Sequence, residues 1–304
     1  MNRYGLIVCG VVLVFLLSCS SLPTAQQDSD DVQIEAAKIR EGIFMLTGRG
    51  GNIGVSVGKD GVFLIDNQFA ALTQKIKDTV SSLSSSPIKL VFNTHWHSDH
   101  VGGNENFGLS GSLIIAHYNV RKRMSTEQFV EAFGSRVPAS PQAALPVVTF
   151  DNELTVHLND DEIHVFHAPS AHTDGDAVIH FRRGNVVHMG DLFFNRRYPF
   201  IDLSSGGSVN GMIAVADRVL QMIDSETKII PGHGEIGDQN SLKEFRDMLV
   251  VVRNSVDTMV VSGKTIKEVI DAKPSKRFDE IWGKNFMSPE AFIKIVYSSL
   301  KKES

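Results

Sequence analysis

The stretch NTHWHSDHVGGN, residues 93–104, places three histidines and an aspartate within six positions, directly after an apolar run typical of a strand. Side chains of an extended segment alternate between two sides, so His95 and His97 point the same way and can bind one ion. Asp99 and His100 then project differently and can bind a second ion. Imidazole and carboxylate groups suit borderline divalent ions such as zinc. Surface polarity and a buried histidine cluster are the simpler interpretations.

Three later segments carry donors of the same two types. His172 begins the motif HTDGD, Asp191 ends the pair GD at 190–191, and His233 lies within PGHG at 231–234. Each donor follows an apolar segment that predicts a strand, and catalytic residues commonly lie on loops at the ends of such a scaffold. If these strand ends line one edge of the fold, four distant segments deliver ligands to one place. The pattern therefore favours a metal site.

With the motifs in this order, the chain resembles the metallo-β-lactamase superfamily over roughly residues 39–233. The resemblance implies an α+β fold, a four-layer αββα sandwich with the metals at one edge between the sheets, followed by C-terminal helices. It also implies two zinc ions per chain, with three ligands for the first, three for the second and one bridging carboxylate. These ligands are, in that order, His95, His97 and His172; Asp99, His100 and His233; and Asp191.

The chemistry that the resemblance implies is hydrolysis of a carbonyl centre in an ester, thioester, lactone or lactam. Two metal ions close together lower the pKa of a shared water, and one of them polarises the carbonyl group that the resulting hydroxide attacks. Asp99, besides acting as a ligand, could orient that water or take its proton. We therefore expect a dinuclear zinc hydrolase with a small-molecule substrate.

Departures from the patterns of the superfamily leave other functions open. One subclass of β-lactamases carries a cysteine ligand where Asp191 stands, and no lysine stands shortly after Leu192 to grip the carboxylate of the drug. A β-lactamase of broad or weak activity is therefore one alternative. A mono-iron enzyme resembling the persulfide dioxygenases is a second. A catalytically idle, metal-binding lipoprotein that recognises a partner is a third, although the complete ligand set argues against it.

The segment LFFNRRYPFID, residues 192–202, holds the candidate substrate contacts. Arg196, Arg197 and Tyr198 could anchor an anionic group beside the metals, or else be solvated on a surface loop. The phenylalanines of the same segment are expected in the core rather than in a pocket. They are Phe193, Phe194 and Phe200.

Residues that flank the motifs are expected to support them. Trp96 is predicted to pack beneath the first motif. Asp174 and Asp176 are predicted to fix the loop of His172, because ligating imidazoles usually have such partners. The remaining histidines lie on predicted strands and are not expected to be ligands. They are His117, His157, His164, His167, His180 and His188.

The composition fits one folded domain, predicted over residues 37–304. The chain has 304 residues, 42% apolar content and a net charge of -5 without a basic stripe, so nucleic acid is not an expected partner. Periodicity predicts strands and helices in mixed order, including a helix over residues 120–133 and a loop over residues 136–146.

The N-terminal segment predicts export. The apolar run at residues 6–17 suits the core of a signal peptide and falls short of the roughly 20 residues that a membrane-spanning helix needs. LLSCSS then resembles a lipoprotein cleavage site, which predicts a signal peptide over residues 1–19 and a lipid anchor at Cys19, with an ordinary cleaved signal as the alternative. A polar tether over residues 20–36 would follow, placing the protein in the periplasm or cell envelope.

The cysteine content narrows the possible ligands. Cys9 and Cys19 are the only cysteines of the chain, and both lie in the predicted signal peptide. A metal bound by the folded domain must therefore use histidine and carboxylate.

Overall fold

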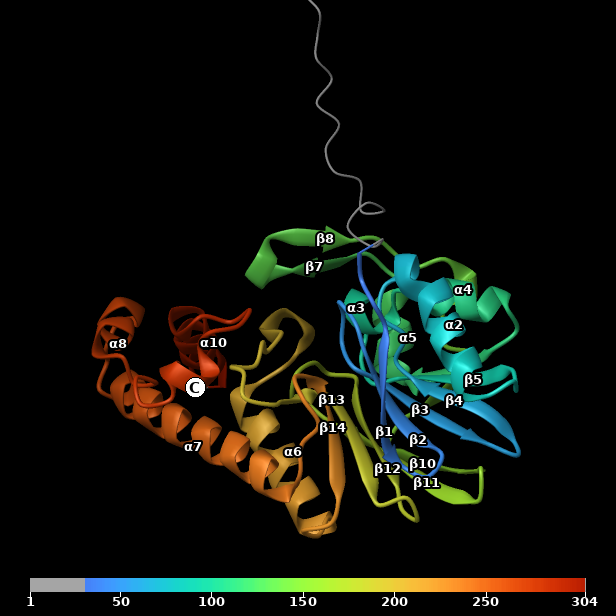
Figure 1. The fold of residues 1–304 in the computed structure, drawn as a ribbon. Coiled ribbons are helices and arrows are strands. Elements are labelled where there is room, and N and C mark those ends of the chain that lie inside the picture. The colour runs from blue at the N-terminus through green and yellow to red at the C-terminus, as the bar shows by residue number, and fades with distance from the viewer. Residues whose placement is uncertain (1–30, 304) are drawn as a thin grey trace, which may run out of the picture.

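The computed structural model describes residues 31–303, which form two β-sheets packed face to face with helices outside each sheet (Figure 1). The first sheet has seven strands, in the spatial order β1 (Glu35–Arg40), β2 (Ile43–Thr47), β3 (Ile53–Gly58), β4 (Gly61–Ile65), β5 (Ile88–Asn93), β6 (Leu113–His117) and β9 (Val148–Phe150). The second has five, β10 (Glu153–Leu158), β11 (Asp161–Ala168), β12 (Asp176–Phe181), β13 (Val186–Phe194) and β14 (Lys228–His233).

The described helices fall into two sets along the chain. The first set accompanies the first sheet and comprises α2 (Thr73–Leu83), α3 (Ser98–Val101), α4 (Asn104–Leu109) and α5 (Tyr118–Met124). The second set follows β13 and comprises α6 (Val209–Met222), α7 (Gln239–Val261), α8 (Ile266–Ala272), α9 (Asp279–Trp282) and α10 (Pro289–Glu303). Short 3-10 turns span Ala70–Leu72, Glu131–Phe133, Gln142–Ala144 and Leu203–Ser205.

Strand alternation separates the layers. In β4, Val62 and Leu64 pack in the cluster that contains Ile76 of α2, whereas Phe63 and Ile65 lie in the cluster between the two sheets. A third cluster joins the outer face of the second sheet to α6, α7 and α10. Each fully buried apolar side chain contributes roughly 1.5–3 kcal/mol relative to an exposed one. The predicted αββα sandwich with C-terminal helices is confirmed.

Parallel pairing brings several strand ends to one edge. β5 pairs in parallel with both β4 and β6, and β13 pairs in parallel with β14. β13 does not end before Asp191, as the sequence pattern suggested, because Phe194 still pairs with His233. Asp191 instead lies where the register of β13 shifts, next to Gly190 at a φ of 51°. A glycine adopts this left-handed conformation without the strain that a Cβ would bring.

The helix predicted over residues 120–133 is wrong beyond Met124, where α5 ends. The chain continues into β7 (Gln128–Val130), which pairs with β8 (Ser135–Val137) in a separate hairpin. Gly134, at a φ of 57°, reverses the chain between the two strands, and the left-handed region is incompatible with a continuing helix. The loop predicted over residues 136–146 therefore begins inside β8 and holds a 3-10 turn.

The N-terminal boundary also differs from the sequence pattern. β1 begins at Glu35, which pairs with Thr47 of β2, so the sheet starts inside the segment predicted as a tether. The predicted signal peptide and the lipid anchor at Cys19 lie outside the described residues. Among residues 31–303, no helix has both the length and the apolar character needed to cross a membrane.

Candidate metal centre

The seven predicted ligands converge in two groups at the edge where the strands end. Within each group, the ligand atoms all lie within 4.8 Å of one another. The first group is His95, His97, His172 and Asp191, and the second is Asp99, His100 and His233. Segments far apart in the sequence therefore meet in one place.

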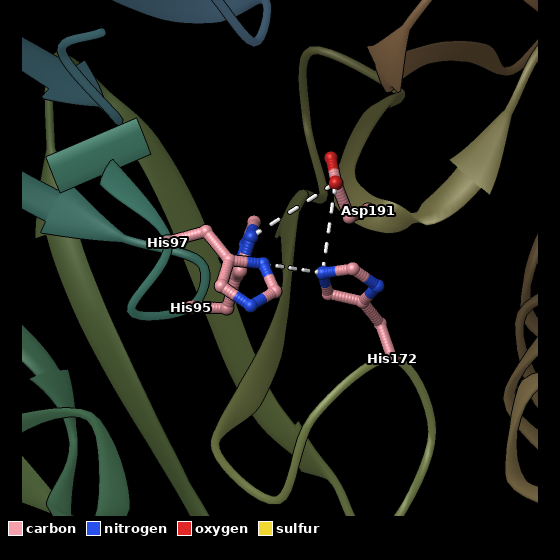
Figure 2. Close-up of side chains that lie close together, drawn as sticks. All are labelled: His95, His97, His172 and Asp191. Atoms are coloured by element: carbon pink, nitrogen blue, oxygen red, sulfur yellow. Dashed lines mark hydrogen bonds and ion pairs between the residues drawn. The ribbon is translucent and has the colours of Figure 1, made fainter. Parts of the chain in front are cut away.

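Figure 2 shows the first group, in which four side chains point toward a common centre. Nε2 of His172 lies 2.9 Å from Nδ1 of His97 and 3.6 Å from Oδ2 of Asp191. Nε2 of His95 lies 3.9 Å from the same carboxylate oxygen. His95 and His97 come from the loop between β5 and α3, and their rings are 4.9 Å apart, as expected for side chains two positions apart on one side.

The second group lies on the other side of the Asp191 carboxylate. Oδ2 of Asp99 lies 3.2 Å from Nε2 of His233 and 3.5 Å from Nε2 of His100. Oδ1 of Asp191 lies 3.0 Å from Nε2 of His100 and 3.4 Å from Nε2 of His233. Asp191 thus presents Oδ2 to the first group and Oδ1 to the second.

The donor set fits divalent cations. Nε2 of His95, Nε2 of His100 and Oδ1 of Asp191 are buried and make no hydrogen bond of normal geometry. An unsatisfied buried polar group costs about 1–3 kcal/mol, so such atoms rarely face one another without a ligand. Donors around a tetrahedral ion with bonds of 2.0–2.1 Å stand about 3.3 Å apart. The separations given above lie between 2.9 Å and 3.9 Å, on both sides of this value.

Asp66 orients one ligand of each group. Its Oδ2 lies 2.7 Å from Nδ1 of His100 and accepts a hydrogen bond of 2.7 Å from the hydroxyl of Thr94, which in turn lies 3.0 Å from Nδ1 of His95. Asp66 is fully buried and has a φ of 62°, a conformation that non-glycine residues keep mainly where the surrounding structure enforces it. Both histidines therefore turn Nε2 toward the centre.

The remaining histidines of the first group are also held from behind. Oδ2 of Asp202 lies 3.1 Å from Nε2 of His97, and Nδ1 of His172 lies 2.8 Å from the carbonyl oxygen of Phe200. Asp176 accepts hydrogen bonds of 2.7 Å from the backbone N–H groups of His172 and Thr173, so it fixes the loop, as predicted. Ring orientation is thereby set before any ion binds.

Asp174 supports the loop of His172 through a contact with another side chain, Arg123, and does not contact the His172 ring itself. Its carboxylate makes a two-pronged ion pair with Arg123, through Nε at 2.7 Å and Nη2 at 2.8 Å. Trp96 is buried beneath the first motif, as predicted, and its ring lies 4.8 Å from that of His97. It also lines a cavity beside the donors, which is described below.

The electrostatics keep the carboxylates ionised. Burial alone raises the pKa of Asp191, but His233 and His100 hold that pKa well below its usual value. Burial likewise raises the pKa of Asp99, yet the charge of His100 and the hydrogen bond from His233 lower it to about 2. Both carboxylates are therefore charged near neutral pH and available to a cation.

Two histidines of the first group are kept neutral. Burial, followed by the charge of His100, moves the pKa of His95 well below its ordinary value. Burial also lowers the pKa of His172 to about 4. A neutral imidazole offers a free lone pair, which is the form that binds a metal ion.

The sequence profile of the metallo-beta-lactamase superfamily matches residues 46–260. The chain belongs to this superfamily. A hydroxyacylglutathione hydrolase from Nitrosococcus oceani is 27% identical over 147 residues, which is 48% of this chain and 48% of that relative. The chain thus matches about half the length of that enzyme. A metallo-beta-lactamase type 2 from Elizabethkingia meningoseptica is 19% identical over 246 residues, covering 78% of this chain and 92% of the relative.

Solved structures show the same fold. A metallo-beta-lactamase from Pontibacter korlensis aligns with a TM-score of 0.59 and 19% identity, covering 71% of this chain and 99% of that one. A double mutant of the sec-alkyl sulfatase PisA1 aligns with a TM-score of 0.67 and 16% identity, covering 90% of this chain and 51% of that one. Both structures share the fold of most of this chain.

A cavity of about 440 Å³ opens beside the donors. Asp99, Asp191 and His233 reach it, and the rest of its lining is largely apolar. Phe194 and Phe200, predicted as core, are buried but also line the cavity, because their strand and loop pass directly beside the donors. Phe193 does pack in the core, 5.4 Å from the ring of Phe245.

The three predicted substrate contacts are placed differently from one another. Arg197 is half-buried and lines the cavity. Arg196 is exposed and lines only a neighbouring polar hollow. Tyr198 is buried and also lines the cavity, but its ring stacks on Phe292 and its hydroxyl donates a hydrogen bond of 2.8 Å to Asp279. The hydroxyl of Tyr198 is therefore committed to the α9 region.

The histidines set aside from the sequence lie outside the two donor groups. His188 is buried near the centre and contacts the carbonyl oxygen of Asn52 at 3.2 Å. His117 and His167 stack on each other with ring centroids 3.7 Å apart. Each ring of His117, His167 and His188 has a backbone carbonyl oxygen as a hydrogen-bond partner.

Sequence reasoning missed Asp66 and Asp202. Asp66 ends the segment GVFLID, directly after a buried strand whose neighbour carries the first motif, and that position was a usable signal. Asp202 lies in an irregular loop, and nothing in its local sequence indicates contact with His97.

Proposed function

We propose that the chain is a zinc-dependent hydrolase that binds two zinc ions and cleaves an ester, thioester, lactone or lactam. The observation that carries this proposal is the position of Asp191, whose two carboxylate oxygens face two separate sets of donors. Histidine and carboxylate without cysteine suit zinc in a catalytic rather than a purely structural site. His95, His97 and His172 would hold one ion, and Asp99, His100 and His233 the other.

When bound, the metal ions would lower the pKa of a water and polarise the carbonyl group of the substrate. Asp99 borders the cavity with its side chain 27% exposed, so its carboxylate can accept a hydrogen bond from a water there. A carboxylate beside a bound cation stays ionised at neutral pH, as this orienting role requires. We propose Asp99 as both ligand and proton acceptor.

Arg197 is the proposed contact for an anionic group of the substrate. Its guanidinium makes no hydrogen bond or ion pair with any residue in the range 31–303, and it lines both the cavity and the neighbouring polar hollow. An unpartnered, half-buried guanidinium suits a carboxylate or phosphate, which it can bind through two parallel hydrogen bonds. Arg196 and Tyr198 are weaker candidates because of their placement.

A β-lactamase remains the second candidate. It is favoured by the lactamases among the relatives and structural neighbours, which share most of their length with this chain. Arg197 would then take the place of the missing lysine as the contact for the carboxylate of the drug. The mono-iron alternative is less favoured, because one ion would leave one donor group without a ligand.

The proposal is tested by metal analysis combined with a substrate panel. The purified chain should contain two zinc equivalents and should hydrolyse at least one of a chromogenic lactam, a thioester, a lactone and an aryl ester. Treatment with a chelator should abolish turnover, and added zinc should restore it. Undiminished activity in a metal-free preparation would refute the proposal.

We also propose that the protein is exported and lipid-anchored through Cys19, and that it acts in the cell envelope. The apolar run at residues 6–17 and the cysteine that follows support this location. Membrane fractionation of cells expressing the wild type and Cys19→Ser tests it. The wild type should sediment with membranes and the variant should not.

A further inference from the structure

A continuous series of aromatic rings runs from the protein surface to the donor groups. The ring of Phe286 lies 5.8 Å from that of Phe133, and the ring of Phe133 lies 4.9 Å from that of Phe200. Phe200 in turn lies 5.8 Å from the rings of both His97 and His172. The three phenylalanines come from the hairpin turn, the loop after β13 and the segment before α10.

The outer rings of this series are exposed to solvent. Phe286 is 76% exposed and Phe133 is 52% exposed, whereas Phe200 is buried. Exposed aromatic side chains that touch one another form an apolar patch, and such a patch beside a cleft is typical of a binding site. The apolar surface of Phe133 and Phe286 is in contact with water in the free protein. A bound apolar group would remove this surface from water, which is favourable.

The same three rings separate two hollows. They line the cavity of about 440 Å³ beside the donors and also a groove of about 430 Å³ that runs toward α10. Apolar side chains such as Ile201 and Ile295 also line the groove, together with Lys294. The apolar surface starts with Phe200 at the donors and continues over Phe133 and Phe286. It is therefore too long to be filled by one aromatic ring of a substrate.

We propose that the substrates of this site carry a medium-length alkyl chain on the acyl side of the bond that is cleaved. This inference rests on the proposed hydrolase function and names its substrate class. The carbonyl group lies at the donors, and the chain lies along Phe200 and Phe133 toward Phe286. In the reaction, the oxygen of water bonds to the carbonyl carbon and the bond to the leaving group breaks. The leaving atom takes one proton of the water, and the other is released when the carboxylic acid product ionises.

The first experiment measures kcat/KM for the 4-nitrophenyl esters of acetate, butyrate, hexanoate and octanoate with the zinc-loaded full chain. Each methylene that reaches the apolar wall should raise kcat/KM about 2- to 4-fold. Phe133→Ala and Phe286→Ala should each lower kcat/KM for the octanoate ester about 10-fold or more and for the acetate ester less than about 2-fold.

Phe129→Ala is the matched control. Phe129 lies on the same hairpin and is 51% exposed, almost equal to Phe133, but it contacts Arg136 and does not line the cavity. This variant should keep the wild-type chain-length profile. A flat profile in the wild type, or an equal loss on short and long esters in Phe133→Ala, would overturn the inference.

The second experiment separates this inference from the hydrolase proposal. Calorimetric titration with octanoate and acetate measures binding without turnover. Octanoate should bind at least about 10-fold more tightly than acetate, and Phe133→Ala should remove that difference. If no ester is hydrolysed but this difference is present, the hydrolase proposal fails and the apolar site stands. If the esters are hydrolysed but chain length has no effect on binding, the inference fails alone.

Discussion

Asp202 holds His97 by the nitrogen that faces away from the other donors. Its Oδ2 lies 3.1 Å from Nε2 of His97, while Nδ1 of His97 lies 2.9 Å from Nε2 of His172. His97 is therefore set to bind through Nδ1, whereas His95 and His100 bind through Nε2. The acceptor on Nε2 keeps its proton there and leaves the lone pair on Nδ1.

Replacing Asp202 by asparagine should weaken the first metal site. An asparagine amide can donate to Nε2, which would shift the proton of His97 to Nδ1, while its carbonyl oxygen still accepts the bonds that Oδ1 takes from the backbone of Ser204 and Ser205. We expect metal affinity to fall about 10- to 100-fold. Competition with a chromogenic chelator measures the change. Asp217→Asn, which removes a carboxylate that pairs with Arg246 outside the donor groups, should leave the affinity unchanged.

Removing single ligands should distinguish the bridging residue from the others. His233→Ala should lose the metal of the second group and keep that of the first, because the first group remains intact. Asp191→Ala should weaken both, since each of its oxygens faces one group. The number of metal equivalents that each variant retains after gel filtration measures these losses. Equal losses in the two variants would contradict the bridging geometry.

Glycine at position 51 should be required for the second group. A Cβ there would lie 2.1 Å from Cε1 of His100, a contact that no real structure tolerates, so Gly51→Ala must displace that ring. We expect the second metal to be lost and activity to fall more than about 100-fold, as for other misplaced catalytic groups. Gly58→Ala is the control, because its Cβ would crowd only the side chain of Asn159, far from the donors.

The stacked pair of His117 and His167 should make stability depend on pH. Burial, followed by the charge of His167, lowers the pKa of His117, and burial lowers the pKa of His167. Both native pKa values lie below the unfolded value of about 6.5, so at acidic pH the unfolded chain binds more protons than the native chain. The free energy of unfolding should therefore decrease below about pH 6.5 from this pair.

Urea unfolding at pH 8 and pH 5.5 measures this effect. His117→Gln should reduce the drop in the free energy of unfolding between the two pH values relative to the wild type. All other groups titrate in the wild type and in the variant alike. The difference between the two drops in the free energy of unfolding therefore reports on the His117–His167 pair alone. An identical drop in the two proteins would show that the pair does not contribute.

Local sequence predicted most of the layered fold. The alternation in GVFLID places Val62 and Leu64 on one face and Phe63 and Ile65 on the other, and the structure separates them into different layers. The hairpin around Gly134 was missed because the apolar residues before it, including Val120 and Met124, fit a helical period up to the point where the helix ends. Short strands carry too few residues for periodicity to identify them.

The sequence by itself determined which donors could form the centre, because the types and spacing of His95, His97, Asp99 and His100 are local properties of one segment, and later motifs supplied the rest. Only the tertiary structure decided which nitrogen each histidine turns inward, through contacts such as that of Asp202 with His97. It alone also placed Phe133 and Phe286 at the cavity that adjoins the donors. Contacts between residues over a hundred positions apart depend on how the layers pack, and no local pattern encodes that packing.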